Sequence, residues 1–194
     1  MPSWRALTYI DEPLAELSVP AGPVRLWRGV GSGLAQRRDD PAGVFWAVGD
    51  RGPNVSVRTA VEAWGLSALA PHLALDGAKV MPLLDAGPAL AELRLEGDVV
   101  TCVRTLPIRG ADGRPLSGRP PLAGGHAEAE PALDLDGERL APDPFGADTE
   151  GLVALADGGF AVAHNGNISN AMKLRRELIR RGSIFQSTSD TETI

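Results

Sequence analysis

Pairs of glycine and aspartate recur along the first 160 residues and divide them into short segments. Such pairs supply the positive φ that tight hairpin turns require. Apolar runs of strand length lie between them, at residues 44–48, 93–95, 99–106, 152–155 and 160–163. The pairs are Gly49-Asp50, Asp76-Gly77, Gly97-Asp98, Asp112-Gly113, Asp136-Gly137 and Asp157-Gly158. This pattern predicts a mainly β fold of short strands joined by tight turns.

Two local predictions are sharper than the rest. Residues 93–100 alternate apolar and polar side chains around Gly97-Asp98, which predicts a β-hairpin. Residues 56–69 carry apolar side chains at partly helical spacing, so this interval is either a helix or an irregular loop.

The composition changes near residue 160. All 16 prolines lie at or before Pro144, and residues 161–194 carry five basic side chains against three acidic ones in a chain of net charge -6. Residues 171–181 contain no glycine or proline and precede Gly182, which predicts a helix, and residues 183–186 fit a short strand. We therefore expect a β domain over 1–160 and a short strand-helix-strand α+β tail over 161–194.

The sequence Ser189-Asp190-Thr191-Glu192 has the form of a helix-capping box. It lies two residues before the end of the sequence, so we expect a helix that has been cut off.

Charge and hydropathy argue against several classes of protein. The acidic balance weighs against general nucleic-acid binding, and no run approaches the roughly 20 apolar residues of a membrane span. Without an export signal in the sequence as given, we expect a cytoplasmic location.

Cys102 lies within a predicted strand and is expected to be a buried, inert thiol. His72 and His126 have no spaced partner and are expected to be surface or packing residues.

Carboxylates crowd into residues 128–150, where only Arg139 opposes eight of them. Oxygen ligands from several loops can hold calcium, but the same composition fits a solvated acidic loop. The run 134–137 lacks the remaining ligands of a helix-loop-helix calcium site, so the metal hypothesis depends on other evidence.

Three motifs, at residues 45–54, 112–118 and 143–152, resemble the phytase-like family, also called the esterase-like activity of phytase family. The resemblance spans about residues 25–160. It implies a β-propeller-like fold and the hydrolysis of a small ester or phosphate ester. The resemblance also leaves an exported location open. Candidate catalytic residues by this resemblance are Asp50, Arg51, Asp148 and Glu150, with Asn54 binding substrate.

Physical chemistry permits those roles without requiring them. Arg51 has a planar donor fork that suits phosphate, while Asp148 and Glu150 suit a general base or a calcium ion. Alternatively, Asp50 and Asp148 only form turns, since glycine and proline flank both motifs. A propeller blade takes roughly 40–45 residues and closure needs at least four. Residues 1–160 therefore predict a partial propeller.

Residues 161–194 closely resemble part of the class II glutamine amidotransferase domain of the amidophosphoribosyltransferase family. The resemblance rests on His164-Asn165-Gly166-Asn167 and on Ser189-Asp190-Thr191-Glu192. It implies that Asn165 and Gly166 form an oxyanion hole and that Asp190 binds the glutamine α-amino group. That family uses an N-terminal cysteine, whereas this sequence begins Met1-Pro2, so we do not expect amidotransferase activity from this chain alone.

The leading hypothesis is thus an incomplete phytase-like hydrolase that acts on a small ester or phosphate, with calcium as its one candidate cofactor. The alternative is a glutamine amidotransferase fragment related to purine biosynthesis. A third reading is a non-functional chimera with its junction near residues 158–161. We expect no nucleic-acid or membrane partner, and the oligomeric state stays open.

Overall fold

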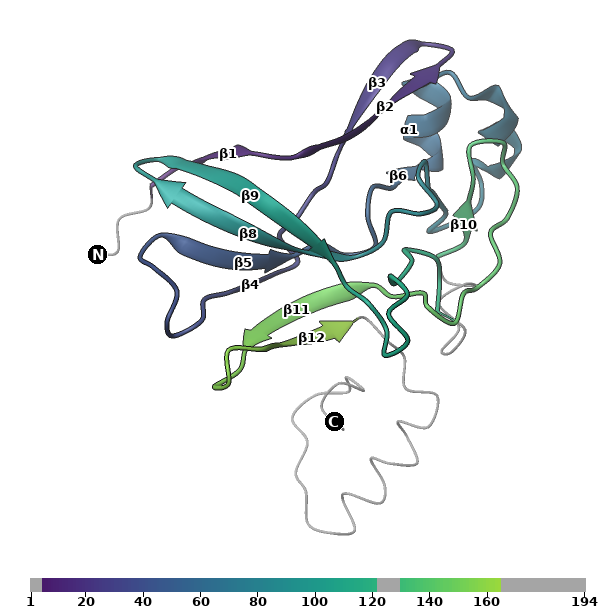
Figure 1. Ribbon diagram of the computed structural model, residues 1–194. Helices are drawn as coiled ribbons and strands as arrows, with labels where there is room; N and C mark the ends of the chain where they lie inside the picture. Colours follow the sequence, from purple (N-terminus) through teal and green to yellow (C-terminus); the bar gives the residue numbers. More distant parts are fainter. Residues whose placement is uncertain (1–4, 122–129, 165–194) are drawn as a thin grey trace, which may run out of the picture.

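The computed structural model describes residues 5–121 and 130–164. Strands predominate in these residues and fall into four separate sheets (Figure 1). The described strands do not close into a ring, so the propeller-like arrangement stays a prediction. The helix, strand and capping box predicted within 165–194 lie outside the described residues.

The largest sheet has five strands. β1 pairs with β9 in parallel, and the other neighbours are antiparallel. In spatial order the strands are β1 (Thr8–Ile10), β9 (Val99–Pro107), β8 (Ala89–Glu96), β5 (Val44–Val48) and β4 (Gly33–Ala35).

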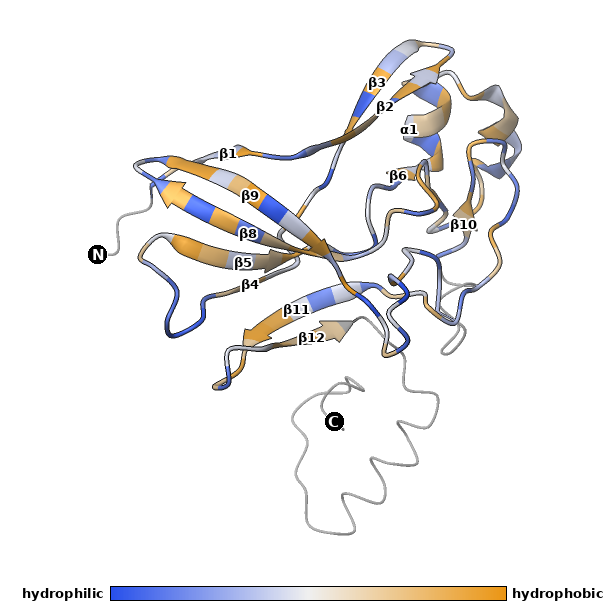
Figure 2. Ribbon diagram, viewed as in Figure 1, coloured by the Kyte–Doolittle hydropathy of each residue, from blue (hydrophilic) through white to orange (hydrophobic). Residues whose placement is uncertain are grey.

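The hairpin predicted around Gly97-Asp98 is confirmed as β8 and β9, in which Glu96 pairs with Val99. Gly97 has a φ of 60°, which a residue with a side chain rarely adopts. Apolar and polar residues alternate along β8, as the banded colouring in Figure 2 shows. The alternation and the turn together specify this hairpin.

The other three sheets are smaller. Two are antiparallel hairpins, and the third is a three-stranded sheet in which β7 pairs with β10 in parallel. The hairpins are β2 (Pro13–Val19) with β3 (Gly22–Trp27) and β11 (Thr149–Ala154) with β12 (Phe160–His164). The third sheet contains β10 (Ala132–Leu133), β7 (Lys79–Val80) and β6 (Val55–Ser56).

The interval 56–69 contains two short helices rather than one. Ser56 caps α1 (Val57–Glu62) by accepting a hydrogen bond from the backbone N–H of Thr59. Gly65, with a φ of 75°, then breaks the helical path before the 3₁₀ helix η1 (Ser67–His72). No described helix has the length and apolar character needed to cross a membrane.

Hydrophobic residues gather on both faces of β5. Trp46 and Val48 pack against Leu152 of β11 on one face, while Ala47 packs with Ala91 and Leu93 on the other. A separate core joins α1, η1 and the β2–β3 hairpin. Its buried members are Leu26, Val57, Ala60, Trp64, Leu69, Ala78, Val80 and Leu133.

The β11–β12 hairpin crosses the predicted domain boundary between residues 160 and 161, because Leu152 pairs with Val162. The hairpin lies beside β4 and β5 (Figure 1). A Cβ on Gly33 of β4 would lie 2.6 Å from the backbone nitrogen of Leu152, so this close approach needs glycine. Residues 161–164, where the predicted tail begins, are therefore part of a hairpin that packs against the preceding β structure.

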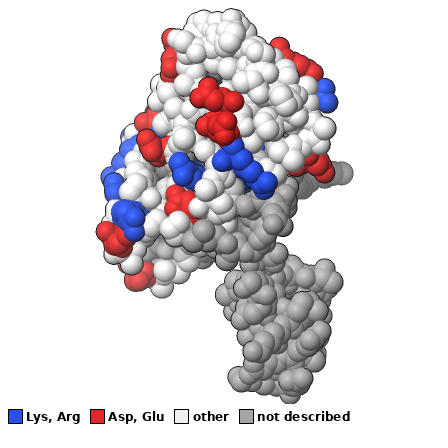
Figure 3. All heavy atoms as spheres, turned by 90° about the vertical axis from the view of Figure 1, so that its right-hand side faces the viewer, with Lys and Arg blue, Asp and Glu red and all other residues white. Residues whose placement is uncertain are grey.

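Acidic and basic side chains are interspersed on the face that Figure 3 presents. No broad area of positive charge appears there among the residues drawn in colour.

Candidate functional site

The end of β5 and the start of β11 bring two distant motifs together. The chain leaves β5 at Val48 and enters a loop that carries Asp50 and Arg51. Thr149, the first residue of β11, donates its hydroxyl to the backbone carbonyl of Asp50 at 3.1 Å and also contacts the carbonyl of Gly49. Asp148 and Glu150 are therefore held next to the Asp50–Arg51 loop.

Arg51 lies at the centre of this region and is only 7% exposed. Its Nη2 donates to Oδ2 of the buried Asp148 and lies 2.9 Å from Oε2 of Glu130. Burial opposes the charge of Arg51, but the hydrogen bond and charge of Asp148, followed by the charges of Glu130 and Asp50, raise its pKa overall. The guanidinium that we expected to face a phosphate is thus enclosed by carboxylates.

Two further carboxyl groups near Arg51, those of Asp50 and Glu150, have raised pKa values. Burial raises the pKa of Asp50, and the charge of Asp148 raises it further, although the backbone N–H of Arg51 lowers it. Desolvation also raises the pKa of Glu150, with added effects from Asp148, Asp50 and Glu130. We call these five side chains the Arg51 cluster: Asp50, Arg51, Glu130, Asp148 and Glu150. Four carboxyl groups against one guanidinium, with Lys79 as a further cation near Asp50, leave an excess of negative charge here.

The motif at residues 112–118 also reaches the cluster. A Cβ on Gly118 would lie 1.7 Å from the carbonyl oxygen of Arg51, so only glycine permits this contact. Nearby, Ser117 donates its hydroxyl to Asp143 at 2.8 Å, linking the second motif to the third. All three motifs singled out in the sequence therefore meet in space.

Other predicted site residues are placed differently. Asn54 donates its side-chain N–H to the carbonyl of Gly52 at 3.2 Å and lines a cavity beside Asp50. Asn165, Gly166, Asp190 and His126 lie outside the described residues. In the part of the chain that the structure describes, no group of three or more His, Cys, Asp or Glu side chains is arranged to hold a metal ion. The calcium role of Asp148 and Glu150 therefore gains no support from geometry.

Sequence reasoning missed two members of this region. Glu130 belongs to the acidic run, and only its contact with Arg51 distinguishes it from the other carboxylates there. Thr149 lies inside the motif at residues 143–152, and its side-chain hydroxyl is the feature that could have marked it as a hydrogen-bond donor to the Asp50 carbonyl. The contacts of both residues join segments about 80 to 100 positions apart, so no local pattern reveals them.

Comparisons with known proteins connect the C-terminal part of the chain with amidotransferases. Residues 137–194 match the sequence profile of the glutamine amidotransferase domain. No solved structure is similar at a significant level.

The similar curated proteins have much longer chains than the matched stretch. The chain is 58% identical over 40 residues to the amidophosphoribosyltransferase of Rhizobium etli, covering 21% of this chain and 8% of that protein. It is 56% identical over 43 residues to the amidophosphoribosyltransferase of Lacticaseibacillus casei, covering 22% of each. A glutamine–fructose-6-phosphate aminotransferase of Symbiobacterium thermophilum is 57% identical over 37 residues, covering 19% of this chain and 6% of that protein. The chain thus spans less than a quarter of the length of these relatives.

These comparisons overturn the leading functional hypothesis. The phytase-like, ester-hydrolysing interpretation finds no support, and the matched range 137–194 includes the motif at 143–152 on which it partly rested. Short motifs of glycine, aspartate and proline recur because tight turns need them, which makes them weak evidence for an activity. The part of the chain that known proteins do identify, residues 137–194, is similar to the glutamine amidotransferase domain.

Proposed function

We propose that this chain recognises L-glutamine through residues 161–194, with the glutamine-binding groups of a class II glutamine amidotransferase domain. Asn165 and Gly166 would stabilise the oxyanion formed at the glutamine amide, and Asp190 would bind the α-amino group. The match of residues 137–194 to that domain carries the proposal, because this range contains both motifs.

The chemistry of amide hydrolysis fits these residue types. Attack on the amide carbon creates a tetrahedral oxyanion, which an asparagine side chain and a glycine N–H stabilise from about 3 Å. The strand β12, which is paired with β11, ends at His164, the first residue of the motif His164-Asn165-Gly166-Asn167.

The proposal assigns recognition of glutamine, not the nucleophile, to this sequence. Its one cysteine is Cys102, on β9. Burial and the negative charges of Glu12 and Asp11 raise the pKa of this thiol, which lowers its thiolate fraction near neutral pH. Cys102 therefore lacks the activation that a nucleophilic cysteine needs.

Calorimetric titration of the full chain with L-glutamine tests this function. We expect saturable binding that prefers L-glutamine to D-glutamine, with an affinity at least about tenfold weaker in Asp190→Asn, since an ionic contact is worth about 1.5–3 kcal/mol. Asp39→Asn is the matched control, because it removes the same charge from an exposed loop.

Two results would contradict the proposal. One is the absence of glutamine binding by the folded chain, and the other is equal affinity in Asp190→Asn and the parent protein. An ammonia-release assay run in parallel detects turnover, and turnover that survives Cys102→Ser would identify a nucleophile other than this thiol.

A further inference from the structure

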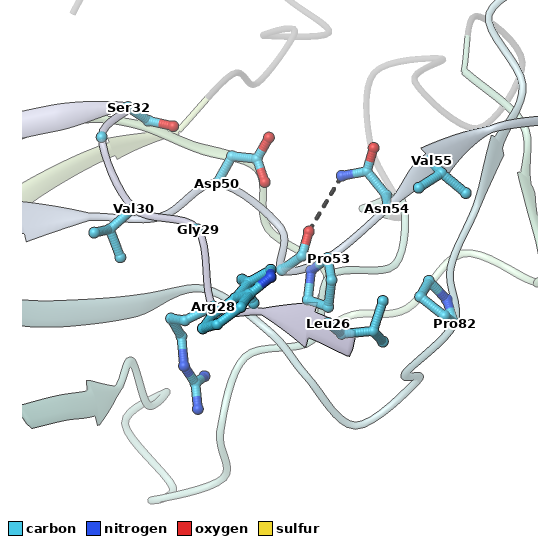
Figure 4. A pocket seen from close by; sticks show the side chains of 13 residues that line it. Leu26, Arg28, Gly29, Val30, Ser32, Asp50, Pro53, Asn54, Val55 and Pro82 are labelled. Atoms are coloured by element: carbon cyan, nitrogen blue, oxygen red, sulfur yellow. Dashed lines mark hydrogen bonds between the residues drawn. The ribbon is translucent and has the colours of Figure 1, made fainter. Parts of the chain in front are cut away.

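A cavity of about 600 Å³ lies next to the Arg51 cluster (Figure 4). Its walls come from the end of β3 and the segment that follows it, and from the loop between β5 and β6, with Pro82 at one side. This volume falls within the range of small-molecule sites. The lining belongs to residues 26–55 and Pro82, outside the amidotransferase match, so its ligand is a separate question from the proposed function.

Two side chains of this cavity, Asp50 and Asn54, carry acceptor atoms that no described residue uses. Asp50 accepts the backbone N–H of Arg51 through Oδ1, and its Oδ2 has no partner among the described residues. Asn54 uses its N–H for the carbonyl of Gly52, which leaves its amide oxygen without a partner in the same residues. Figure 4 shows the Asp50 carboxyl and the Asn54 amide on the same side of the cavity. A ligand at this position must therefore donate hydrogen bonds.

The charge at this position is negative. Arg28 also lines the cavity, but its side chain extends away from Asp50 in Figure 4. Its Nε lies 3.8 Å from Oε2 of Glu12 and has no hydrogen-bond partner among the described residues. Asp148 adds negative charge near Asp50, while Lys79 and Arg51, which itself contacts Asp148 and Glu130, oppose it. Carboxylates of the Arg51 cluster outnumber these cations, which favours a cation over a neutral donor.

An aromatic wall adds a second attraction for a cation. Trp27 lines the cavity and is 46% exposed. The Arg25 guanidinium lies 5.8 Å from the centroid of the Trp27 ring, so this indole already has one cationic neighbour. Indole faces attract ammonium groups, and their area also covers an alkyl chain. Pro53 supplies further apolar lining.

We propose that this cavity binds a small organic ammonium ion. The ammonium group donates to Asp50 Oδ2 and to the Asn54 amide oxygen, while the carbon chain packs on Trp27 and Pro53. A bare metal ion does not fit the apolar lining or the volume, and the described residues hold no metal-ligand grouping there. The juxtaposition of an unpaired carboxylate, an amide oxygen and an exposed indole carries this inference.

A matched ligand series tests the inference on the full chain. n-Butylammonium, n-butanol and butyrate have similar size and carry positive, zero and negative charge. We expect saturable binding of n-butylammonium by two-dimensional NMR, with shifts at Asp50, Asn54 and the Trp27 indole N–H. We expect no saturable binding of the other two ligands. Equal binding of n-butanol, or none of n-butylammonium at 10 mM (about 2.7 kcal/mol at 1 M standard state), would overturn the proposal.

Variants locate the site. Asp50→Asn keeps an acceptor for the Arg51 N–H and removes the charge, so we expect at least about tenfold weaker binding. Asp98→Asn is the matched control, since this exposed carboxylate pairs with Arg5 and does not line the cavity. Trp27→Leu tests the aromatic wall at an exposed position, so it remains informative if Asp50→Asn does not fold. Unchanged affinity in a folded Asp50→Asn or in Trp27→Leu would contradict this site.

Discussion

Arg51 and Asp148, which lie 97 positions apart in the sequence, form a buried ion pair between the loop after β5 and the start of β11. Their side chains are 8% and 7% exposed. The pair has a second carboxylate, since Glu130 also contacts Arg51 Nη2. This geometry indicates a structural link between the main sheet and the β11–β12 hairpin.

Replacement of Arg51 by methionine should strongly destabilise the fold. It leaves Asp148 buried without a countercharge, and loss of one partner of a buried pair typically costs about 3–5 kcal/mol. Urea unfolding measures the change. Asp148→Asn in the Arg51→Met background should recover part of this loss, because it removes the unpaired charge.

Arg58→Met is the control for that experiment. Arg58 pairs with Glu62 on the surface of α1 and is 70% exposed, so its loss should cost about 0.3–0.5 kcal/mol. Similar costs for Arg51→Met and Arg58→Met would show that the buried pair does not stabilise the fold.

Gly118→Ala should destabilise the protein by about 3 kcal/mol or more, at the upper end of the cost of overpacking. Its Cβ would meet the Arg51 carbonyl oxygen at 1.7 Å, which forces the Asp50–Arg51 loop to move. Thermal unfolding measures the effect. Gly110→Ala is the comparison, because its nearest neighbour would be a side-chain oxygen at 3.3 Å. Equal stability of the two variants would argue against the close contact at Gly118.

Asp40 should make stability depend on acidic pH. A hydrogen bond from Arg37 lowers the Asp40 pKa, against the effect of desolvation, and backbone and Trp46 N–H groups assist. Because the folded-state pKa lies below the unfolded value of about 3.9, this stabilisation is present above pH ~4 and is lost as the pH falls through the folded-state pKa. Unfolding of the parent and Asp40→Asn at pH 7 and at pH 3 measures it.

The difference between Asp40→Asn and the parent should shrink at the lower pH. Asp39→Asn, at the exposed neighbouring position, should show no such change. A difference for Asp40→Asn that is constant with pH would exclude the carboxylate charge as its cause.

Cys102 should react slowly with Ellman's reagent at pH 7.5. It is half-buried rather than fully buried, and burial followed by the charges of Glu12 and Asp11 raises its thiol pKa. We expect the thiol to react faster after unfolding in urea. In folded Glu12→Gln it should also react faster than in the folded parent, but by less than on unfolding. Glu16→Gln, an exposed position on β2, is the control and should react like the parent. A folded thiol as reactive as the unfolded one would contradict the raised pKa.

Local chemistry explains which parts of the fold were predictable. The β8–β9 hairpin follows from an alternating pattern and a glycine turn, both contained within neighbouring residues. The strand at 44–48 and the hairpin of β11 and β12 were likewise predicted near their observed bounds. The interval 56–69 was ambiguous because Gly65 divides a partly helical pattern into two short helices.

The candidate site residues were selected by resemblance to known families and not by local sequence patterns. Asp50, Arg51 and Asp148 were selected through a resemblance whose functional implication was wrong, yet the structure does bring these residues together. The role of Arg51 changed, because two carboxylates contact Nη2 of the guanidinium that we had assigned to a phosphate. Asn165, Gly166 and Asp190 still depend on motif similarity.

By itself, the sequence determined the short strands, the positions of several turns and the similarity of its C-terminal part to amidotransferases. These properties depend on neighbouring residues or on the order of motifs. Only the tertiary structure decided that Arg51 is enclosed, that Gly118 lies against it, and that Asp50, Asn54 and Trp27 line one cavity. Such contacts join segments far apart in the chain, and their burial and electrostatics exist only after those segments have packed together.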